Sequence, residues 1–282
     1  MSWSGAGKTS MKKTDKRTLL QKKIAGKGSM LVAFSGGVDS ALLAAIAHDM
    51  LRDKSRCVFI DSPLVPRSAR KEAEQVACDL NLSLEVIPVP LMRNRKFRKN
   101  PVDRCYSCKK MIAGILKQRA RELSIACVAD GSNVSDEGEY RPGLKATTEE
   151  GIFHPFIEAG MTKQDIRDIA RESGYEFWNK PSAACLASRI PYGDEITQKK
   201  LAMIEAAEDL LHNSGFRQVR VRTYGTIARI EVIKEEMQTL LILQDDVIRE
   251  LKAIGFSSVT IDPEGYRSGS MDEILRSHTG IV

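Results

Sequence analysis

A strand-like apolar run that ends at a pair of glycines, the segment Met30–Ser40 (MLVAFSGGVDS), constrains this chain of 282 residues more than any other feature. The apolar residues predict a buried strand, and a helical pattern begins just after the glycines. Two glycines at such a turn let backbone N–H groups approach an anion, and the helix N-terminus adds partial positive charge. Ser35 and Ser40 can donate hydrogen bonds to phosphate, whereas the carboxylate of Asp39 requires a cation between itself and the phosphate. The segment therefore predicts a site for pyrophosphate with Mg²⁺.

The loop Ser35–Ser40 resembles the SGGxDS loop of the PP-loop ATP pyrophosphatases. That family cleaves ATP between its α and β phosphates and adenylates a substrate. The resemblance implies ATP and Mg²⁺ as ligands, with Asp39 in a catalytic role. The implied ATP-binding residues are Ser35, Gly36, Gly37, Val38, Asp39, Ser40, Asp61, Gly131 and Asp136.

Strands and helices alternate through the first half of the chain. Short apolar runs predict three further strands, at residues 56–60, 84–89 and 125–129, and helical spacing occupies residues 67–80 and 102–123. This alternation predicts an α/β fold with a doubly wound parallel sheet, of the PP-loop (adenine nucleotide α hydrolase-like) type. Ligands of such sheets bind at the carboxyl ends of the strands, where Asp39, Asp61 and Gly131 fall.

A second, smaller α+β domain is predicted from residue 195 onward. Its pattern is helix 197–213, strands 218–222 and 227–232, helix 234–253 and strand 258–262, which we interpret as helices on one face of an antiparallel sheet. Arg220 and Arg222 are two residues apart on a strand and so project from the same face. They could clamp a phosphate or carboxylate, or they could form an exposed polar face. We expect a PP-loop domain over residues 29–194 and a substrate-binding and oligomerisation domain over residues 195–282.

The formal net charge of +6 is concentrated at the N-terminus. Residues 1–30 hold eight Lys and Arg against one acid, a net charge of +7, so the rest of the chain sums to −1. We expect residues 1–28 to be a basic, flexible leader. The nearly neutral remainder argues against nucleic acid as the partner. Because no apolar run approaches the length of a membrane span and no signal-peptide core is visible, we expect a cytoplasmic protein with no membrane contact.

Three of the six cysteines have spacing or surroundings that suggest chemistry. Cys105 and Cys108 are three residues apart in a predicted helix, where their thiols face the same way in an electropositive segment that favours thiolate. Cys185 lies in a loop of small residues. Three thiolates could hold zinc with one open position or an iron–sulfur cluster with one open iron, and Cys105 and Cys108 could also be a redox pair.

Seven segments, taken in order, make the chain similar to the LarE family of PP-loop sulfur transferases from about residue 30 to residue 271. They are residues 35–40, 130–136, 140–145, 185–193, 219–222, 228–231 and 265–269. The resemblance implies that the substrate is pyridinium-3,5-biscarboxylic acid mononucleotide, a precursor of the nickel-pincer cofactor. The implied reaction adenylates a ring carboxylate and then replaces AMP with sulfur.

The resemblance also assigns roles to single residues. Family members deliver sulfur either from one sacrificed cysteine or through three cysteines that resemble the ligands of a [4Fe-4S] cluster. Because Ala184 occupies the place of the sacrificed cysteine here, we expect the cluster type. The implied cluster ligands are Cys105, Cys108 and Cys185; the implied catalytic residues besides Asp39 are Cys185, Ser188 and Arg189; the implied substrate-phosphate ligands are Ser188, Arg189, Arg220, Arg222 and Arg267; and the implied second metal site contains Glu208 and Glu231.

Two other functions fit parts of the sequence. An iron–sulfur-dependent tRNA thiolase of the same superfamily would account for the basic leader and for the Arg93–Lys110 cluster of cations. A nucleotide-binding regulator that senses iron or redox state would bind ATP without releasing pyrophosphate. We expect a small-molecule nucleotide as partner and a homo-oligomer, and the sequence does not identify the sulfide donor.

Overall fold

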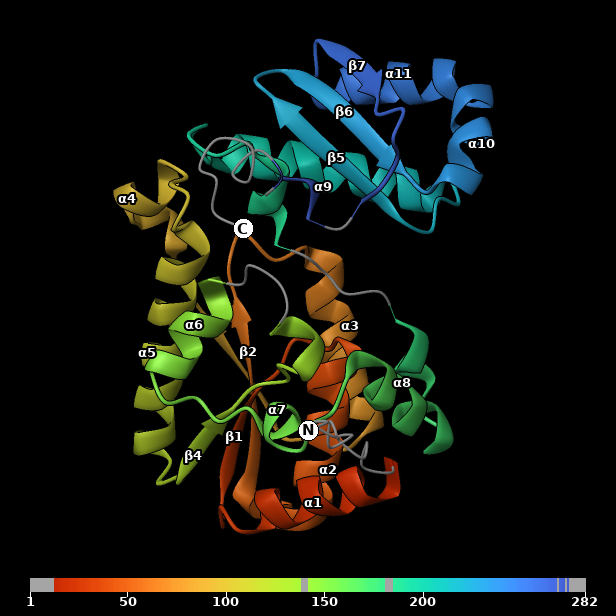
Figure 1. Ribbon diagram of the computed structural model, residues 1–282. Helices are drawn as coiled ribbons and strands as arrows, with labels where there is room; N and C mark the ends of the chain where they lie inside the picture. Colours follow the sequence, from red (N-terminus) through yellow and green to blue (C-terminus); the bar gives the residue numbers. More distant parts are fainter. Residues whose placement is uncertain (1–12, 138–141, 181–184, 268, 272, 274–282) are drawn as a thin grey trace, which may run out of the picture. The chain divides into compact units, whose positions relative to one another are not determined.

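The computed structural model describes residues 13–137, 142–180, 185–267, 269–271 and 273 (Figure 1). The chain divides into two compact units. The N-terminal unit comprises residues 1–60, 69–87 and 105–182, and the C-terminal unit comprises residues 61–68, 88–104 and 183–282. This division differs from the expected boundary at residue 195, because two segments that follow N-terminal strands group with the C-terminal unit.

The N-terminal unit contains the predicted parallel sheet. Its strands are β1 (Met30–Ala33), β2 (Ser55–Asp61), β3 (Leu84–Pro88) and β4 (Cys127–Ala129), in the spatial order β3-β2-β1-β4. β1 pairs in parallel with both of its neighbours, β2 and β4. The chain adds strands outward from β1 to β3 and then returns to the other side of β1. β1 and β4 therefore flank the topological switch point, where α/β sheets bind ligands.

Helices cover both faces of this sheet, as an α/β fold requires. Figure 1 shows α5 on one side and α2 with α3 on the other. α5 packs Leu116 and its neighbours against Leu31, Val58 and Val128 of the sheet. The helices of this unit include α2 (Val38–Leu51), α3 (Arg67–Asp79), α5 (Arg104–Glu122), α6 (Pro142–Glu149), α7 (Pro155–Glu158) and α8 (Lys163–Glu172), with 3₁₀ turns at Arg52–Lys54, Val134–Asp136 and Glu176–Asn179. The short helix α4 (Arg95–Arg98) and the 3₁₀ turns at Leu91–Arg93 and Leu186–Arg189 belong to the C-terminal unit.

The basic leader is not flexible over the part that the structure describes. Residues 13–25 form helix α1 (Lys13–Ala25), whose Leu20 and Ile24 are completely buried. Leu20 and Ile24 are one helical turn apart, so they share the face that packs on α2 and α7. The cations of α1 meet carboxylates: Lys16 pairs with Asp165 of α8 at 2.8 Å. The expectation of a flexible leader is therefore wrong for residues 13–25, and residues 1–12 lie outside the described part.

The C-terminal unit has a three-stranded sheet covered by helices. Its elements are α9 (Gln198–Asn213), β5 (Val219–Tyr224), β6 (Ile227–Val232), a 3₁₀ turn (Lys234–Glu236), α10 (Met237–Ile242), α11 (Gln244–Ile254) and β7 (Ser258–Ile261). β5 and β6 are antiparallel, but β7 runs parallel to β6, so the expected antiparallel sheet is wrong for this pair. A parallel neighbour follows because helices α10 and α11 carry the chain back across the sheet before β7 begins. The predicted helix 234–253 is likewise broken, at Leu243.

None of the helices in the described ranges is long and apolar enough to cross a membrane.

Candidate functional site

The glycine pair makes a tight turn between β1 and α2. Gly36 has a φ of +74°, and a Cβ there would lie 2.7 Å from the Cα of Ala73, so only glycine fits. Ser40 Oγ accepts a hydrogen bond from the Ser35 backbone N–H at 3.1 Å and donates to the Gly37 carbonyl at 3.0 Å. Gly37 is the N-cap of α2, and no described side chain caps this helix end. The first N–H groups of α2 are therefore available to an anion.

The turn after β4 packs directly on this loop. A Cβ on Gly131 would lie 2.9 Å from both the carbonyl carbon of Asp39 and the backbone nitrogen of Ser40. In the same turn, Asn133 Nδ2 lies 3.4 Å from Asp39 Oδ1. The structure thus brings the Ser35–Ser40 loop and Gly131 together at the switch point between β1 and β4.

Asp39 is a largely buried carboxylate among other charges. Its Oδ2 lies 3.5 Å from Lys163 Nζ, and its side chain is about one-fifth exposed. Burial raises the pKa of Asp39, the charge of Asp136 raises this pKa further, and Lys163 opposes both effects. Two carboxylates close enough to repel favour a cation between them, and oxygen donors suit Mg²⁺. Asp39 and Asp136 therefore fit the magnesium implied by the loop.

Lys163 was not among the residues predicted from sequence. It is the first residue of α8, after a capping box in which Thr162 and Asp165 bond to each other's backbone N–H. A cation at a helix N-terminus opposes the helix dipole, and this was the signal available in the sequence. The unfavourable interaction of Lys163 with the helix dipole is offset because its ammonium group faces the Asp39 carboxylate.

A second buried ion pair was also missed. Asp130, immediately after β4, accepts a hydrogen bond from His154 Nδ1 at 2.7 Å, and His154 Nε2 lies 3.1 Å from the Thr148 hydroxyl. Burial opposes ionisation of Asp130, but the hydrogen bond and charge of His154 hold the pKa of this carboxyl below its usual range. In sequence, His154 had no ligand-like spacing to any other residue, so only the fold shows its partner.

Asp61 and the three cysteines predicted as cluster ligands are the remaining predicted residues near the N-terminal strands and in the Cys185 loop. Asp61 ends β2, and its carboxylate is 3.1 Å from Arg67 Nη1. Cys105 and Cys108 occupy the first turns of α5, with Cys105 exposed and Cys108 half-buried, and Cys185 is exposed. None of the three is in a disulfide. Within the described residues, no group of three His, Cys, Asp or Glu side chains gathers into a possible metal site.

In the C-terminal unit, two of the predicted phosphate ligands are engaged by carboxylates. Arg189 is only 2% exposed, and its Nε and Nη2 donate to the two oxygens of Glu208 at 2.9 and 2.8 Å. Arg222 makes a similar two-pronged pair with Glu231 and also donates to the Ser188 carbonyl at 2.8 Å.

These pairs argue against the predicted second metal site. The carboxylates of Glu208 and Glu231 are occupied by guanidinium groups, and Glu208 also accepts the Val221 backbone N–H at 2.9 Å. Such two-pronged pairs with an additional hydrogen bond compensate buried charge without a metal. We therefore interpret both glutamates as structural partners of arginine.

Arg220 differs from its neighbours. Among the described residues it has no carboxylate partner: Nη1 donates to the Val219 carbonyl at 2.8 Å, and the guanidinium lies over the ring of Tyr266, 5.3 Å from its centre. Burial lowers the pKa of Arg220 and repulsion from Arg189 lowers it further, while the nearby charge of Glu208 raises it. A half-buried guanidinium repelled by other cations favours a bound anion.

Ser188 Oγ donates to the Cys185 carbonyl at 2.7 Å and accepts from Arg189.

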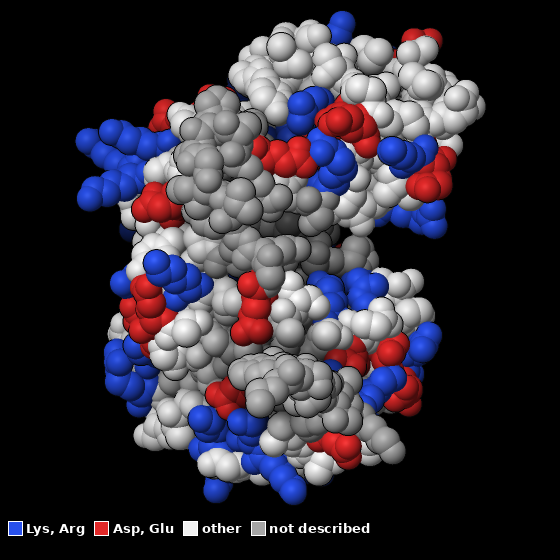
Figure 2. Space-filling model, viewed as in Figure 1, with Lys and Arg blue, Asp and Glu red and all other residues white. Residues whose placement is uncertain are grey.

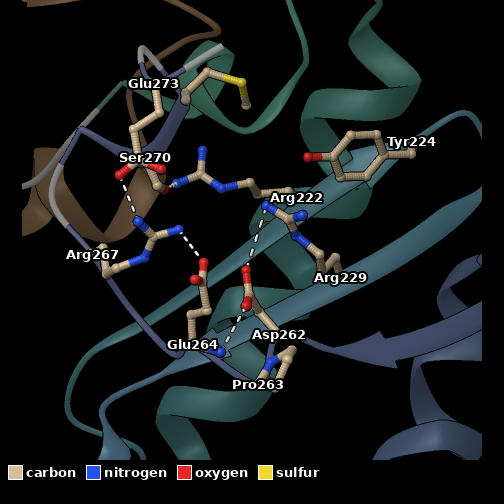
Figure 3. A pocket seen from close by; sticks show the side chains of 10 residues that line it. Arg222, Tyr224, Arg229, Asp262, Pro263, Glu264, Arg267, Ser270 and Glu273 are labelled. Carbon is tan, nitrogen blue, oxygen red and sulfur yellow. Dashed lines mark hydrogen bonds and ion pairs between the residues drawn. The ribbon is translucent and has the colours of Figure 1, made fainter. Parts of the chain in front are cut away.

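A cavity of about 280 Å³ lies beside Arg222 (Figure 3). Arg267 lines this cavity and pairs with Glu264 and with Glu273, the latter at 2.6 Å. Arg229 lies 3.5 Å from Asp262. Figure 2 shows the same alternation of basic and acidic side chains over β5 and β6. An anion at the predicted ligand Arg267 would have to displace a carboxylate.

Comparison with known proteins gives the following relationships. The family described as NAD synthase matches residues 14–134. A pyridinium-3,5-bisthiocarboxylic acid mononucleotide synthase from Lactiplantibacillus plantarum is 38% identical over 245 residues, which cover 86% of this chain and 89% of that protein. An uncharacterised protein from Synechocystis is 36% identical over 87% of this chain and 92% of its own length. One subunit of a glutamine-hydrolysing GMP synthase from Methanocaldococcus jannaschii is 24% identical over 64% of this chain and 62% of its own.

Proposed function

Because this chain belongs to the LarE family of PP-loop sulfur transferases, we propose that it uses ATP to activate a carboxylate of a pyridinium mononucleotide and then replaces AMP with sulfur. The name of the L. plantarum relative specifies a bisthiocarboxylic acid product. The matching substrate is pyridinium-3,5-biscarboxylic acid mononucleotide, and the reaction then serves nickel-pincer cofactor synthesis. The observation that carries the proposal is the convergence of the Ser35–Ser40 loop, Gly131 and the Asp39–Lys163 pair at one edge of the sheet.

The activation step needs groups that stabilise negative charge on the leaving pyrophosphate. A substrate carboxylate oxygen attacks the α-phosphorus of ATP, the bond to the bridging oxygen breaks, and pyrophosphate leaves with both electrons. N–H groups at the start of α2 could hold phosphate oxygens, and Ser35 could turn its hydroxyl from Ser40 toward the phosphate. Lys163 can turn its ammonium group from Asp39 to the developing charge. Mg²⁺ held by Asp39 and Asp136 would neutralise the same phosphates.

The sulfur step uses the good leaving group, AMP, that adenylation has installed. Sulfide adds to the carbonyl carbon of the acyl-adenylate, and AMP leaves with the former carboxylate oxygen, so the product is a thiocarboxylate. We propose that Cys105, Cys108 and Cys185 hold a [4Fe-4S] cluster, which would supply a bound sulfide. Support comes from the three thiols not being tied up in disulfides and from Cys105 and Cys108 sharing one face at the start of α5.

Substrate recognition is proposed to depend on Arg220. Of the four arginines that the sequence suggested, it alone lacks a carboxylate partner within the described residues. Its guanidinium can pair with the phosphate of a mononucleotide without breaking an existing ion pair. Ser188 supplies a hydroxyl in the same unit.

The tRNA thiolase is less well supported. The leader that suggested RNA binding forms α1, and three of its lysines are paired with carboxylates: Lys13 with Asp168, Lys16 with Asp165 and Lys23 with Glu158. These cations are therefore not free to bind phosphates. The exposed cations near Arg95 are the remaining basic feature.

The decisive experiment measures pyrophosphate release from Mg-ATP by anaerobically purified protein, with and without the pyridinium substrate. We expect release that depends on this substrate and, with sulfide present, a product in which sulfur has replaced oxygen by mass spectrometry. ATP binding without any pyrophosphate release would favour the regulator. Release that requires tRNA instead, and weakens steeply with salt, would favour the thiolase.

Iron and sulfide analysis tests the cluster separately. Replacing any one of the three cysteines by alanine should remove iron and visible absorbance together while leaving pyrophosphate release intact. If wild type instead lost the mass of hydrogen sulfide and bound no iron, Cys185 would be a sacrificed sulfur donor.

A further inference from the structure

We propose that the buried Asp130–His154 pair acts as a latch, which holds the turn after β4 against the phosphate loop and so positions Asp39 for pyrophosphate release. His154 is then a positioning residue that acts through Asp130 and does not touch the substrate. The inference rests on the proposed function, because it assigns Asp39 its role in the ATP reaction.

The latch begins with one oxygen atom that ties two segments together. Asp130 Oδ1 accepts from His154 Nδ1 at 2.7 Å and from the Ser132 backbone N–H at 3.0 Å. The side chain of Asp130 is only 17% exposed and that of His154 only 10%. Asp130 therefore connects the segment before α7 to its own turn, in surroundings where a charged hydrogen bond is stronger than in water.

The imidazole is fixed from its other side as well. The Thr148 hydroxyl lies 3.1 Å from His154 Nε2 and 2.9 Å from the Leu144 carbonyl, so it contacts the edge of the ring opposite Asp130. Both ring nitrogens of His154 therefore have a polar partner, which fixes the orientation of the ring. The backbone beside His154 is held too, since Phe153 N–H bonds to the Val128 carbonyl at 2.8 Å.

The held turn reaches the reacting region by direct packing. Gly131 lies so close to Asp39 and Ser40 that a Cβ would be 2.9 Å from their backbone atoms. Asn133, two residues further on, places its amide 3.4 Å from the Asp39 carboxylate. Because the contact is between backbones, no flexible side chain absorbs a shift of the turn. A displacement of Asp130 is therefore transmitted to Asp39.

The test compares His154→Asn with a matched control, His212→Asn. His212 also makes a hydrogen bond through Nδ1, to the Phe216 carbonyl at 2.9 Å, but it lies at the end of α9 in the C-terminal unit. Pyrophosphate release is measured as a function of Mg²⁺ and ATP concentration. We expect kcat/KM for Mg-ATP to fall about 10- to 100-fold in His154→Asn, as for other residues that orient metal ligands, with a raised Mg²⁺ requirement. The control should stay within about 2-fold of wild type, since distant sites act independently.

A double-mutant cycle tests the route through Asp130. Asp130→Asn should reproduce the kinetic defect, and the double variant should be little worse than either single one, because each removes the same pair. If the two losses are additive, or if His154→Asn lowers only thermal stability with an unchanged Mg²⁺ requirement, the latch is wrong. Should His154→Asn fail to fold, Thr148→Val removes only the outer hydrogen bond and should raise the Mg²⁺ requirement in the same direction.

Amide hydrogen exchange separates the latch from the proposed function, because it needs no substrate. The Ser132 N–H donates to Asp130, so its exchange should accelerate in His154→Asn and not in His212→Asn. Accelerated exchange in a protein whose wild type never releases pyrophosphate would support the connection and refute the proposed reaction. Unchanged exchange in an active enzyme would refute the latch alone.

Discussion

Single arginines in the C-terminal unit differ in the partners that their guanidinium groups contact. Arg189 and Arg222 each donate two N–H groups to a buried carboxylate, whereas Arg220 donates to a neighbouring carbonyl and lies over an aromatic ring. All three belong to segments whose sequence suggested anion binding. A guanidinium already neutralised by glutamate gains little from a phosphate, so Arg220 is the one suited to a ligand.

Substitutions of Arg220 and Arg222 should separate an effect on substrate binding from an effect on protein stability. Arg220→Ala should raise the KM for the mononucleotide about 10-fold or more, the loss of one charge-assisted contact, with little change in stability. Arg222→Ala leaves Glu231 buried without its main partner and should lower the free energy of unfolding by about 3–5 kcal/mol. Steady-state kinetics and urea unfolding of both variants measure the two effects. An equal loss of stability in the two variants would contradict the assignment of Arg220 to substrate binding and of Arg222 to a structural ion pair.

Asp39 should show opposite effects on activity and stability. A carboxyl whose pKa is raised by folding stabilises the protein while protonated, and that contribution is lost as the pH rises through the folded-state pKa. At neutral pH, Asp39→Asn should therefore raise the free energy of unfolding while reducing pyrophosphate release by about 100-fold or more, since metal ligation is lost. The stability gain should shrink as the pH falls through the raised folded-state pKa and should be gone below about pH 4, the ordinary range of an aspartate carboxyl. Retained pyrophosphate release would overturn the assignment of the loop.

At the scale of elements, α1 and α8 form one supporting assembly for the site. Asp165 caps α8 through Thr162 and also pairs with Lys16 of α1, and the first residue of α8 is Lys163. The buried side chains of α1, Leu20 and Ile24, fasten it to the same unit. The charge pattern suggested that residues 13–25 are flexible. Helix α1 instead stabilises the end of α8 that faces Asp39.

Truncation of the buried face of α1 tests this role. Leu20→Ala should lower the free energy of unfolding by about 2–5 kcal/mol, the range for a buried leucine that leaves a cavity. Lys22→Ala, at an exposed position of the same helix, should change it by less than about 0.5 kcal/mol. Chemical unfolding of the two variants makes the comparison, and similar small effects would show that α1 adds no stability.

For the whole molecule, exposed apolar side chains on the C-terminal unit bear on the expected homo-oligomer. Ile242 is 73% exposed at the end of α10, next to the exposed Leu241. Adjacent exposed apolar residues are typical of interfaces between subunits. We expect light scattering to report more than one subunit for wild type and a smaller mass for Ile242→Asp, with unchanged far-UV dichroism. A monomeric wild type would contradict this expectation.

The sequence determined those features that contiguous residues encode. The alternation of apolar strands with helices and the set of seven motifs led to the parallel α/β fold and the family, and the order of glycines, serine and aspartate in the loop led to the proposal of an ATP site. Each depends on local backbone conformation or on hydrophobic period, which neighbouring residues control. The burial of Val219 and Val221 opposite the arginines follows the same rule.

Only the tertiary structure decided which distant groups meet. It paired His154 with Asp130, set Lys163 beside Asp39, matched the lysines of α1 with acids of α8 and gave glutamate partners to Arg189 and Arg222. It also made β7 parallel to β6. Each of these contacts joins residues on different elements, so its formation depends on how whole elements pair and pack. A linear sequence does not show which charged side chains will pair. Burial in the folded protein stabilises particular ion pairs, and it leaves other charges, such as that of Arg220, suited to a ligand.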